Sequence, residues 1–238
     1  MIQKYKISWD IPNNISFLIS TNLSGHSKGK FKYANFSKSV GDKHLAVSKN
    51  IEELKKDNHI RNITFMNQSH SGKLKKLIYY KSNINSDAIY TYNSNISCAV
   101  VTADCIPILV TNSSGTLVGC IHAGWRGLKK NIIEKFFNSI EENNSNFKVL
   151  IGPCISKKNY EVGHQIYKEF PDYKKFFSKN KKGNYNMDIR LIAHDILSKL
   201  GISDVTISTK CTYEDKNFYS YRKNRITGRF ISLIWFKE

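Results

Sequence analysis

The sequence has few acidic residues, no closely spaced cysteine pair and no long apolar run. Its five cysteines are an odd number without a C-x-x-C pair, which argues against a disulfide framework and indicates a reducing compartment. No segment reaches the roughly 20 apolar residues of a membrane span, and the opening MIQKYKISWDIPNN turns polar before it forms a signal-peptide core. We therefore expect a cytoplasmic protein without a membrane partner.

The shortage of acidic residues leaves a large positive charge. The chain has 19 Asp and Glu against 37 Lys and Arg, a formal net charge of +18, which suits nucleic acid, anionic lipid or phosphorylated small molecules as partners. Most basic residues are lysines scattered through Asn-rich and Ser-rich stretches, a pattern typical of solvated loops. No specific nucleic-acid partner is expected. The non-enzymatic alternative is a basic RNA-associated module that uses the lysines and Trp125.

The length and the apolar pattern predict one domain of mixed structure. At 238 residues and 40% hydrophobic composition, residues 1–238 can bury one large core. Helices are expected at 188–200, between an Asp188 N-cap and a Gly201 stop, and at 128–142, 46–56 and 161–179. The Lys-rich and Asn-rich stretch 174–186 is expected to be a solvated surface excursion. Strands are expected at 15–21, 97–102, 106–110, 116–122, 148–152, 205–209 and 229–236. Without regular βα alternation, this mixture indicates an α+β fold whose sheets are covered by helices.

Three potential metal ligands follow or precede strand-like runs. The turn residues NSSG at 112–115 predict that 106–110 and 116–122 pair as a hairpin, which brings Cys105 and His122 to its open end. His70 would be brought to them by the fold. Two His and one thiolate with an open fourth position are typical of catalytic zinc. The same set with a weak axial ligand is the blue-copper pattern, so Cu²⁺ is an alternative to Zn²⁺.

Two other interpretations fit the same residues. A free Cys is often simply buried, and a lone His is often satisfied by a backbone carbonyl. Alternatively, Cys105 is the nucleophile of a cysteine hydrolase and His122 activates it.

The neighbours of these residues supply candidate catalytic and anion-binding groups. In TADCIPILV, alternation along a strand turns Asp104 away from Cys105, so Asp104 is expected to hold a loop or orient a metal-binding His, and we group it with Cys105 and His122 as catalytic. IGPCISKKNYEVG is expected to end a strand at Gly152 and Pro153 and to enter a helix, a junction whose free N–H groups can hold phosphate. The alternative for each arginine is a surface ion pair. The candidate contacts for substrate and phosphate are Trp125, Arg126, Cys154, Arg222 and Arg229.

The motifs together indicate a family. TADCIPILV, GCIHAGWRGLKKNII, IGPCISKKNYEVG and KCT…FYSYRKNRITGR resemble, in order and spacing, the core motifs of the YfiH-like family, long labelled multicopper polyphenol oxidoreductase or laccase. The resemblance spans nearly the whole chain. It implies a purine nucleoside phosphorylase that acts on adenosine, inosine and S-methyl-5′-thioadenosine with phosphate, with adenosine deaminase activity as well. It also implies a zinc site at His70, Cys105 and His122, an α/β/β/α layered sandwich with mixed sheets, and a homodimer.

The chain departs from the family pattern in its N-terminal motif. Where the family usually shows S-T-R-x-G-G-V-S, this chain has STNLSGHS, with Asn22 and Ser24 at the changed positions. Ser39 replaces a usual His, and Ser71 replaces the Gly after the first metal His. These changes bear on substrate affinity and leave the implied metal ligands intact.

The oxidoreductase label has its own requirement. A laccase with a copper cluster carries many histidines in H-x-H pairs, whereas this chain has seven His and no such pair. Electron transfer through a copper cluster is therefore not expected. Polyphenol oxidation by a single copper ion at the three-residue site stays an alternative. An open zinc position can by contrast serve deamination, because zinc lowers the pKa of its bound water to about 7.

Overall fold

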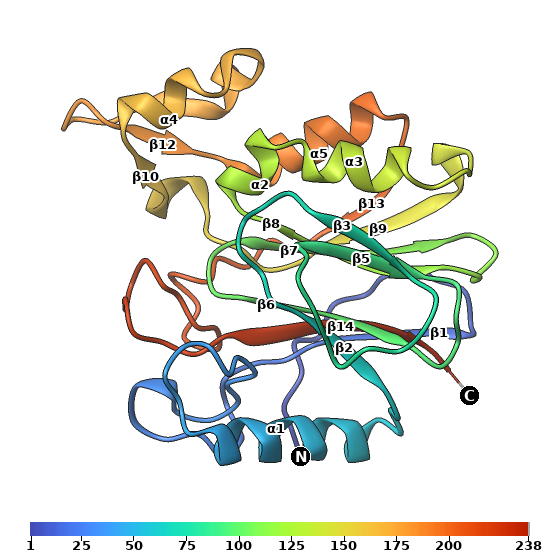
Figure 1. Ribbon diagram of the computed structural model, residues 1–238. Helices are drawn as coiled ribbons and strands as arrows, with labels where there is room; N and C mark the ends of the chain where they lie inside the picture. Colours follow the sequence, from blue (N-terminus) through green and yellow to red (C-terminus); the bar gives the residue numbers. More distant parts are fainter. Residues whose placement is uncertain (238) are drawn as a thin grey trace.

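Two β-sheets packed face to face form the centre of the molecule, and helices cover the outer side of each (Figure 1). The computed structural model describes residues 1–237. The first sheet has five strands in the order β1-β14-β6-β2-β4, and the second has six in the order β13-β9-β7-β8-β5-β3. The first contains β1 (Ile15–Ile19), β2 (Ile63–Met66), β4 (Asn83–Ile84), β6 (Ser97–Thr102) and β14 (Phe230–Phe236). The second contains β3 (Leu74–Leu77), β5 (Ala88–Thr91), β7 (Ile106–Asn112), β8 (Val118–Ala123), β9 (Phe147–Ile151) and β13 (Asp204–Ile207).

The helices complete a four-layered arrangement. Helix α1 (His44–Asp57) covers the five-stranded sheet, and α2 (Trp125–Lys129), α3 (Ile132–Asn138) and α5 (Ile189–Lys199) cover the six-stranded one (Figure 1). This is the α/β/β/α layered α+β fold expected from the sequence. No helix among residues 1–237 is both long enough and apolar enough to cross a membrane.

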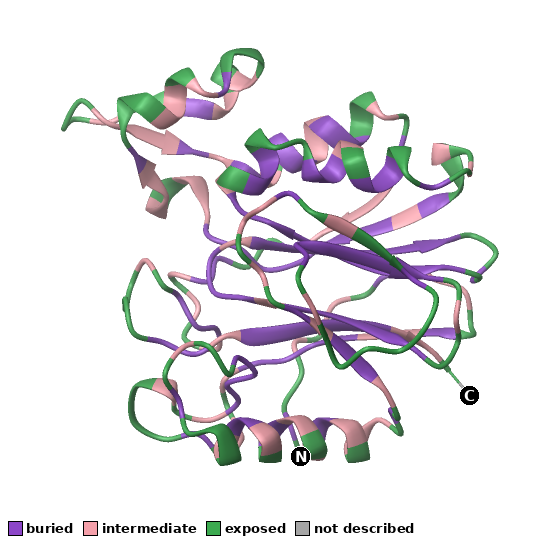
Figure 2. Ribbon diagram, in the orientation of Figure 1, coloured by how far each residue is buried: buried purple, intermediate pink, exposed green. Residues whose placement is uncertain are grey.

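The apolar run of β7 is buried on both faces because the strand lies between two layers. Every residue of β7 is buried (Figure 2). Its alternation sends Ile108 and Val110 toward the helices, where they join Phe136, and sends Leu109 toward the five-stranded sheet, where it joins Ile234. Burial of each such side chain contributes roughly 1.5–3 kcal/mol. The buried central strands therefore hold the loops at their ends in fixed positions.

Several elements agree with the sequence prediction. Strand β6 has the expected bounds, and α5 begins after Asp188, whose side chain accepts a hydrogen bond from the N–H of Leu191 at 3.0 Å. Gly201 follows the helix with a positive φ of 80°. The helix expected at 128–142 is divided into α2 and α3, because Asn131 adopts a left-handed backbone with φ 57°.

The predictions for residues 154–186 were partly wrong. A 3₁₀ turn, Lys157–Asn159, stands where a helix was expected after IGPCIS. The stretch 161–179, expected as one helix, contains only a short α-helix and a 3₁₀ segment, and together with the surface excursion expected at 174–186 it forms a small projecting lobe (Figure 1). It is made of β10 (Glu161–Val162), α4 (His164–Lys168), the 3₁₀ segment Pro171–Phe176, β11 (Phe177–Lys179) and β12 (Tyr185–Met187). The rings of Tyr167 and Tyr185 stack in it with centroids 4.0 Å apart, so aromatic packing helps to order this surface excursion.

Candidate metal centre

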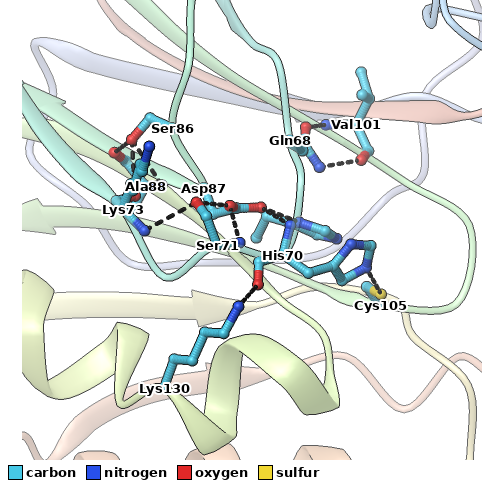
Figure 3. Close-up of polar contacts among 11 residues, drawn as sticks. Gln68, His70, Ser71, Lys73, Ser86, Asp87, Ala88, Val101, Cys105 and Lys130 are labelled. Carbon is cyan, nitrogen blue, oxygen red and sulfur yellow. Dashed lines mark hydrogen bonds and ion pairs between the residues drawn. The ribbon is translucent and has the colours of Figure 1, made fainter.

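The ligand atoms of His70, Cys105 and His122 gather at one point of the structure. One atom from each lies within 4.8 Å of the other two, and no other group of three His, Cys, Asp or Glu side chains among residues 1–237 is placed to hold a metal ion. The His70 Nε2 and Cys105 Sγ atoms are 3.7 Å apart (Figure 3). The imidazole rings of the two histidines meet edge to face, with centroids 4.6 Å apart. Two imidazoles and one thiolate fit zinc or copper.

The predicted hairpin brings two of these residues together. Strands β7 and β8 pair antiparallel, with Pro107 opposite His122, so Cys105 and His122 lie at the open end of the hairpin. Cys105 belongs to the connection from β6 in one sheet to β7 in the other. His70 belongs to the connection from β2 to β3, which also crosses between the sheets. Two of the three candidate ligands therefore lie where the chain passes from one sheet to the other.

A buried carboxylate fixes both histidines. Asp87, which is fully buried, accepts a hydrogen bond on Oδ1 from Nδ1 of His122 at 3.0 Å and from the backbone N–H of His70 at 2.9 Å (Figure 3). Its Oδ2 accepts from the N–H and the hydroxyl of Ser71, both at 2.6 Å. Because Asp87 holds the proton on Nδ1 of His122, Nε2 is the nitrogen left to bind a cation, after it has given up the proton it shares with Cys105. Burial alone would raise the pKa of Asp87, but the hydrogen bonds from these donors lower it below its usual range.

The loop that carries His70 has an unusual backbone. His70 adopts a left-handed conformation with φ 55°, which costs a non-glycine residue free energy. Asp87 holds the N–H side of the loop, and the ammonium of Lys130 donates to the carbonyl oxygen of His70 at 2.6 Å. Gly72, with φ 71°, follows two residues later and packs against the side chain of Lys130. These contacts hold His70 in an orientation that the chain does not adopt by itself.

Gly124 leaves room for the cluster. A Cβ atom at this position would lie 2.7 Å from Sγ of Cys105 and 3.2 Å from Cδ2 of His70. The backbone at Gly124, with φ −84° and ψ 172°, is open to any residue. The requirement for glycine is therefore the space taken by the two side chains rather than the backbone conformation.

Cys105 and His122 form a charge pair. Burial opposes both charges, but the attraction and hydrogen bonds between the two groups lower the pKa of Cys105 to about 6 and raise that of His122 to about 9, with Asp87 adding to the latter. A metal ion bound between Cys105 and His122 would take the place of the positive charge on the protonated His122 ring. The electrostatic environment thus favours the thiolate, which is the form that binds metals.

Asp104 holds a loop and does not orient a histidine. Its carboxylate accepts from the hydroxyl of Thr212 at 2.7 Å and from the backbone N–H of Arg222 at 2.6 Å. Asp104 lies in a bend with φ 95°, so the strand alternation used to predict that it faces away from Cys105 does not apply. The role of orienting a metal-binding His, considered for Asp104, falls to Asp87.

The other residues predicted to contact substrate or phosphate belong to several elements around the metal cluster. Trp125 is half-buried, and the guanidinium of exposed Arg126 lies over its ring at 4.4 Å. The guanidinium of Arg229 is largely buried, which lowers its pKa, and Cys105 and Asp104 lie near enough to oppose that effect. Arg222 donates to the carbonyl of Glu161 at 2.6 Å. Arg222 therefore connects the lobe to the loop between β13 and β14.

Cys154 was predicted to contact substrate or phosphate, and for its side chain this prediction was wrong. Cys154 is fully buried in the core beside α5, and burial raises the pKa of its thiol to about 11. Its backbone pairs with that of Cys211 in an isolated bridge. Its side chain is therefore not exposed to a ligand.

Two residues near the cluster were missed. The sequence offers a signal for Asp87, because an acid placed directly before the buried strand AIYT must have a partner. Tyr160 shows no such signal. Burial raises the pKa of its phenol, and so do the negative charges of Cys105 and Asp104 nearby. The guanidinium of Arg222 lies over its ring at 5.1 Å, so Tyr160 lies among the charged groups around Cys105.

Comparison with known proteins places the chain in a family. Residues 16–237 match the family described as multi-copper polyphenol oxidoreductase laccase. The chain belongs to this family. It is the YfiH-like family whose motifs the sequence resembles. Among its relatives, the purine nucleoside phosphorylase of Haemophilus influenzae is 33% identical over 99% of this chain and 100% of its own length. The purine nucleoside phosphorylase YfiH of Escherichia coli is 32% identical over 95% and 96%.

Solved structures of similar proteins have the same fold. The crystal structure of the Neisseria meningitidis protein NMB0706 superposes with a TM-score of 0.90 at 31% identity, covering 97% of this chain and 98% of its own. YlmD from Geobacillus stearothermophilus gives 0.88 at 25% identity, covering 100% and 99%. The layered sandwich of this chain is thus the architecture of its relatives.

Proposed function

We propose that this family member is a zinc-dependent purine nucleoside phosphorylase. Its substrates would be adenosine, inosine and S-methyl-5′-thioadenosine, which it would cleave with phosphate to the free base and the ribose 1-phosphate or methylthioribose 1-phosphate. An adenosine deaminase activity would share the site. The observation that carries the proposal is the convergence of His70, Cys105 and His122 within 4.8 Å, in a chain whose relatives over nearly its full length are named purine nucleoside phosphorylases.

The donor set fits zinc, and a zinc ion held there would supply Lewis-acid chemistry. The chain's own groups would do the rest. Asp87 keeps the proton on Nδ1 of His122 and so fixes the direction of its free nitrogen. Arg229, largely buried near Cys105, and Arg126, at the exposed start of α2, are the cations placed to bind phosphate. Planar guanidinium groups suit this task because they bind two oxygens at once.

An assay with adenosine tests the proposal. Purified protein is incubated with adenosine, with and without phosphate, and adenine, inosine and hypoxanthine are separated. Phosphorolysis is expected to yield adenine only when phosphate is present, and deamination to yield inosine in either case. Absence of all three products with protein of full zinc content would contradict the proposal.

Elemental analysis of protein purified without added metal distinguishes the alternatives. About one zinc per chain is expected from a three-ligand site. Copper in its place, with oxidation of a polyphenol, would favour the oxidoreductase alternative. A metal-free active protein would favour Cys105 as a nucleophile. The homodimer and the cytoplasmic location stay predictions, and the first is checked by the mass of the particle in solution.

A further inference from the structure

A large cavity lies on the outer side of the five-stranded sheet, beside α1. Its volume is about 710 Å³, within the range of pockets that enclose small organic ligands. The cavity is bounded by residues 36–39, by α1, by β2 with its following loop, and by the segment that leads into β4. Gln68 stiffens one wall, because its amide exchanges two hydrogen bonds with the backbone of Val101, at 2.8 and 2.9 Å (Figure 3). None of the three candidate metal ligands lines it.

The charged side chains of the cavity are all positive. Lys38, Lys55 and Lys73 line it, and no Asp or Glu does. None of the three ammonium groups has an ion-pair partner among the carboxylates of residues 1–237. Lys55 is half-buried, where an uncompensated charge costs more than at the open surface. This arrangement leaves a local excess of positive charge that an anion would neutralise.

The inner surface is apolar and partly aromatic. Phe65 of β2, Val101 of β6 and Ile51 of α1 line the cavity and are only half-buried. Apolar side chains that stay half-exposed inside a cavity gain free energy when a flat apolar group covers them. The inner part of the cavity therefore suits an aromatic ring rather than a simple anion.

One edge of the cavity offers hydrogen bonds to a heterocycle. Asn67 donates from Nδ2 to Oδ1 of Asn85 at 2.9 Å. This leaves Oδ1 of Asn67 as an acceptor and Nδ2 of Asn85 as a donor, side by side at the cavity wall. A paired donor and acceptor on amide side chains match the amino group and ring nitrogen of adenine.

We propose that this cavity binds a nucleoside monophosphate with a purine base. The base would lie against Phe65 and Val101 with its edge toward the two asparagines, and the phosphate ester would contact Lys55 and Lys73. This ligand differs from the phosphorolysis substrates by its 5′-phosphate, and none of the three candidate metal ligands lines its cavity. The proposal stands independently of the proposed enzymatic activity.

Titration calorimetry with four probes tests the ligand class. The probes are AMP, adenosine, ribose 5-phosphate and inorganic phosphate. AMP is expected to bind at least 10-fold more tightly than each of the others, because only AMP offers both the ring and the phosphate; each factor of ten corresponds to about 1.4 kcal/mol. Affinity for AMP no greater than for inorganic phosphate would overturn the proposal.

Matched lysine variants test the place of binding. Lys55→Gln and Lys73→Gln are each expected to weaken AMP binding about 10-fold, the effect of one charge-assisted contact. Lys56→Gln and Lys75→Gln are the controls, because both residues are exposed neighbours outside the cavity, and AMP binding should be unchanged in them. Equal affinities in all four variants would overturn the proposal, as would loss of AMP binding in Cys105→Ser alone, which would place the ligand at the metal centre.

Discussion

His122 and His70 share one buried anchor, because Oδ1 of Asp87 accepts a hydrogen bond from the imidazole Nδ1 of His122 at 3.0 Å and from the backbone N–H of His70 at 2.9 Å. A shift of this carboxylate would move two of the three candidate ligands at once. Ser71, which stands where the family usually has Gly, fits beside them because its hydroxyl donates a fourth hydrogen bond to the carboxylate of Asp87.

Asp87→Asn is expected to weaken zinc binding by about 10- to 100-fold, the usual effect of removing a partner of a metal-binding His. The amide keeps one acceptor oxygen but presents an NH₂ group to donors that need an acceptor. A competition titration against a chromogenic chelator measures the change. Asp104→Asn is expected to have a smaller effect, because its carboxylate contacts Thr212 and Arg222. The reverse ranking would contradict the role given to Asp87.

Gly124→Ala is expected to lower zinc affinity at least 10-fold, because the added methyl group would lie 2.7 Å from Sγ of Cys105 and must displace it. Gly163→Ala is the matched control. Both glycines precede a short helix with extended backbone, and nothing lies within 4 Å of a Cβ at position 163. Chelator competition and circular dichroism should report lost metal and retained fold for Gly124→Ala only.

Cys105→Ser is expected to lose most of its zinc, because a neutral hydroxyl is a far poorer ligand than a thiolate. Elemental analysis of the folded variant gives the result. Cys98→Ala serves as the control, since Cys98 is fully buried between the two sheets and contacts none of the ligands. Stoichiometric zinc in folded Cys105→Ser would show that the ligand set is wrong.

Arg229→Lys is expected to raise the phosphate concentration needed for adenosine cleavage several-fold while zinc content stays unchanged, because lysine keeps the charge but loses the planar fork. Arg225→Lys is the comparison, since Arg225 is exposed in the same loop and also lies over the ring of Tyr221. Initial rates over a phosphate series measure the effect. An equal phosphate dependence in both variants would remove Arg229 from the site.

The local parts of the site could be predicted from the sequence. The turn residues at 112–115 and the apolar runs on either side predict the β7–β8 hairpin, and with it the approach of Cys105 to His122. The capped helix α5 follows from Asp188 and Gly201 in the same way. These features depend on residues close together in the chain, where spacing alone sets geometry.

The long-range parts of the site could not be predicted from the sequence. Asp87 is 35 residues from His122 and 17 from His70, and its role depends on β5 pairing with β8, which no short pattern indicates. The strained backbones of His70 and Asp104 were equally hidden, because tertiary contacts impose them. In the lobe, charge indicated a solvated surface excursion but did not reveal the short paired strands and the stacked tyrosines within it.

His70 and Cys105 lie on two of the connections that pass between the sheets, so an ion bound to them together with His122 would link the two layers. Such an ion binds only the assembled layers, and its free energy of binding adds to the free energy of unfolding. At a free concentration 100 times the dissociation constant, the gain is about 2.7 kcal/mol. Chelation should therefore lower the melting temperature by several degrees in a calorimetric scan, and readdition of zinc should restore it.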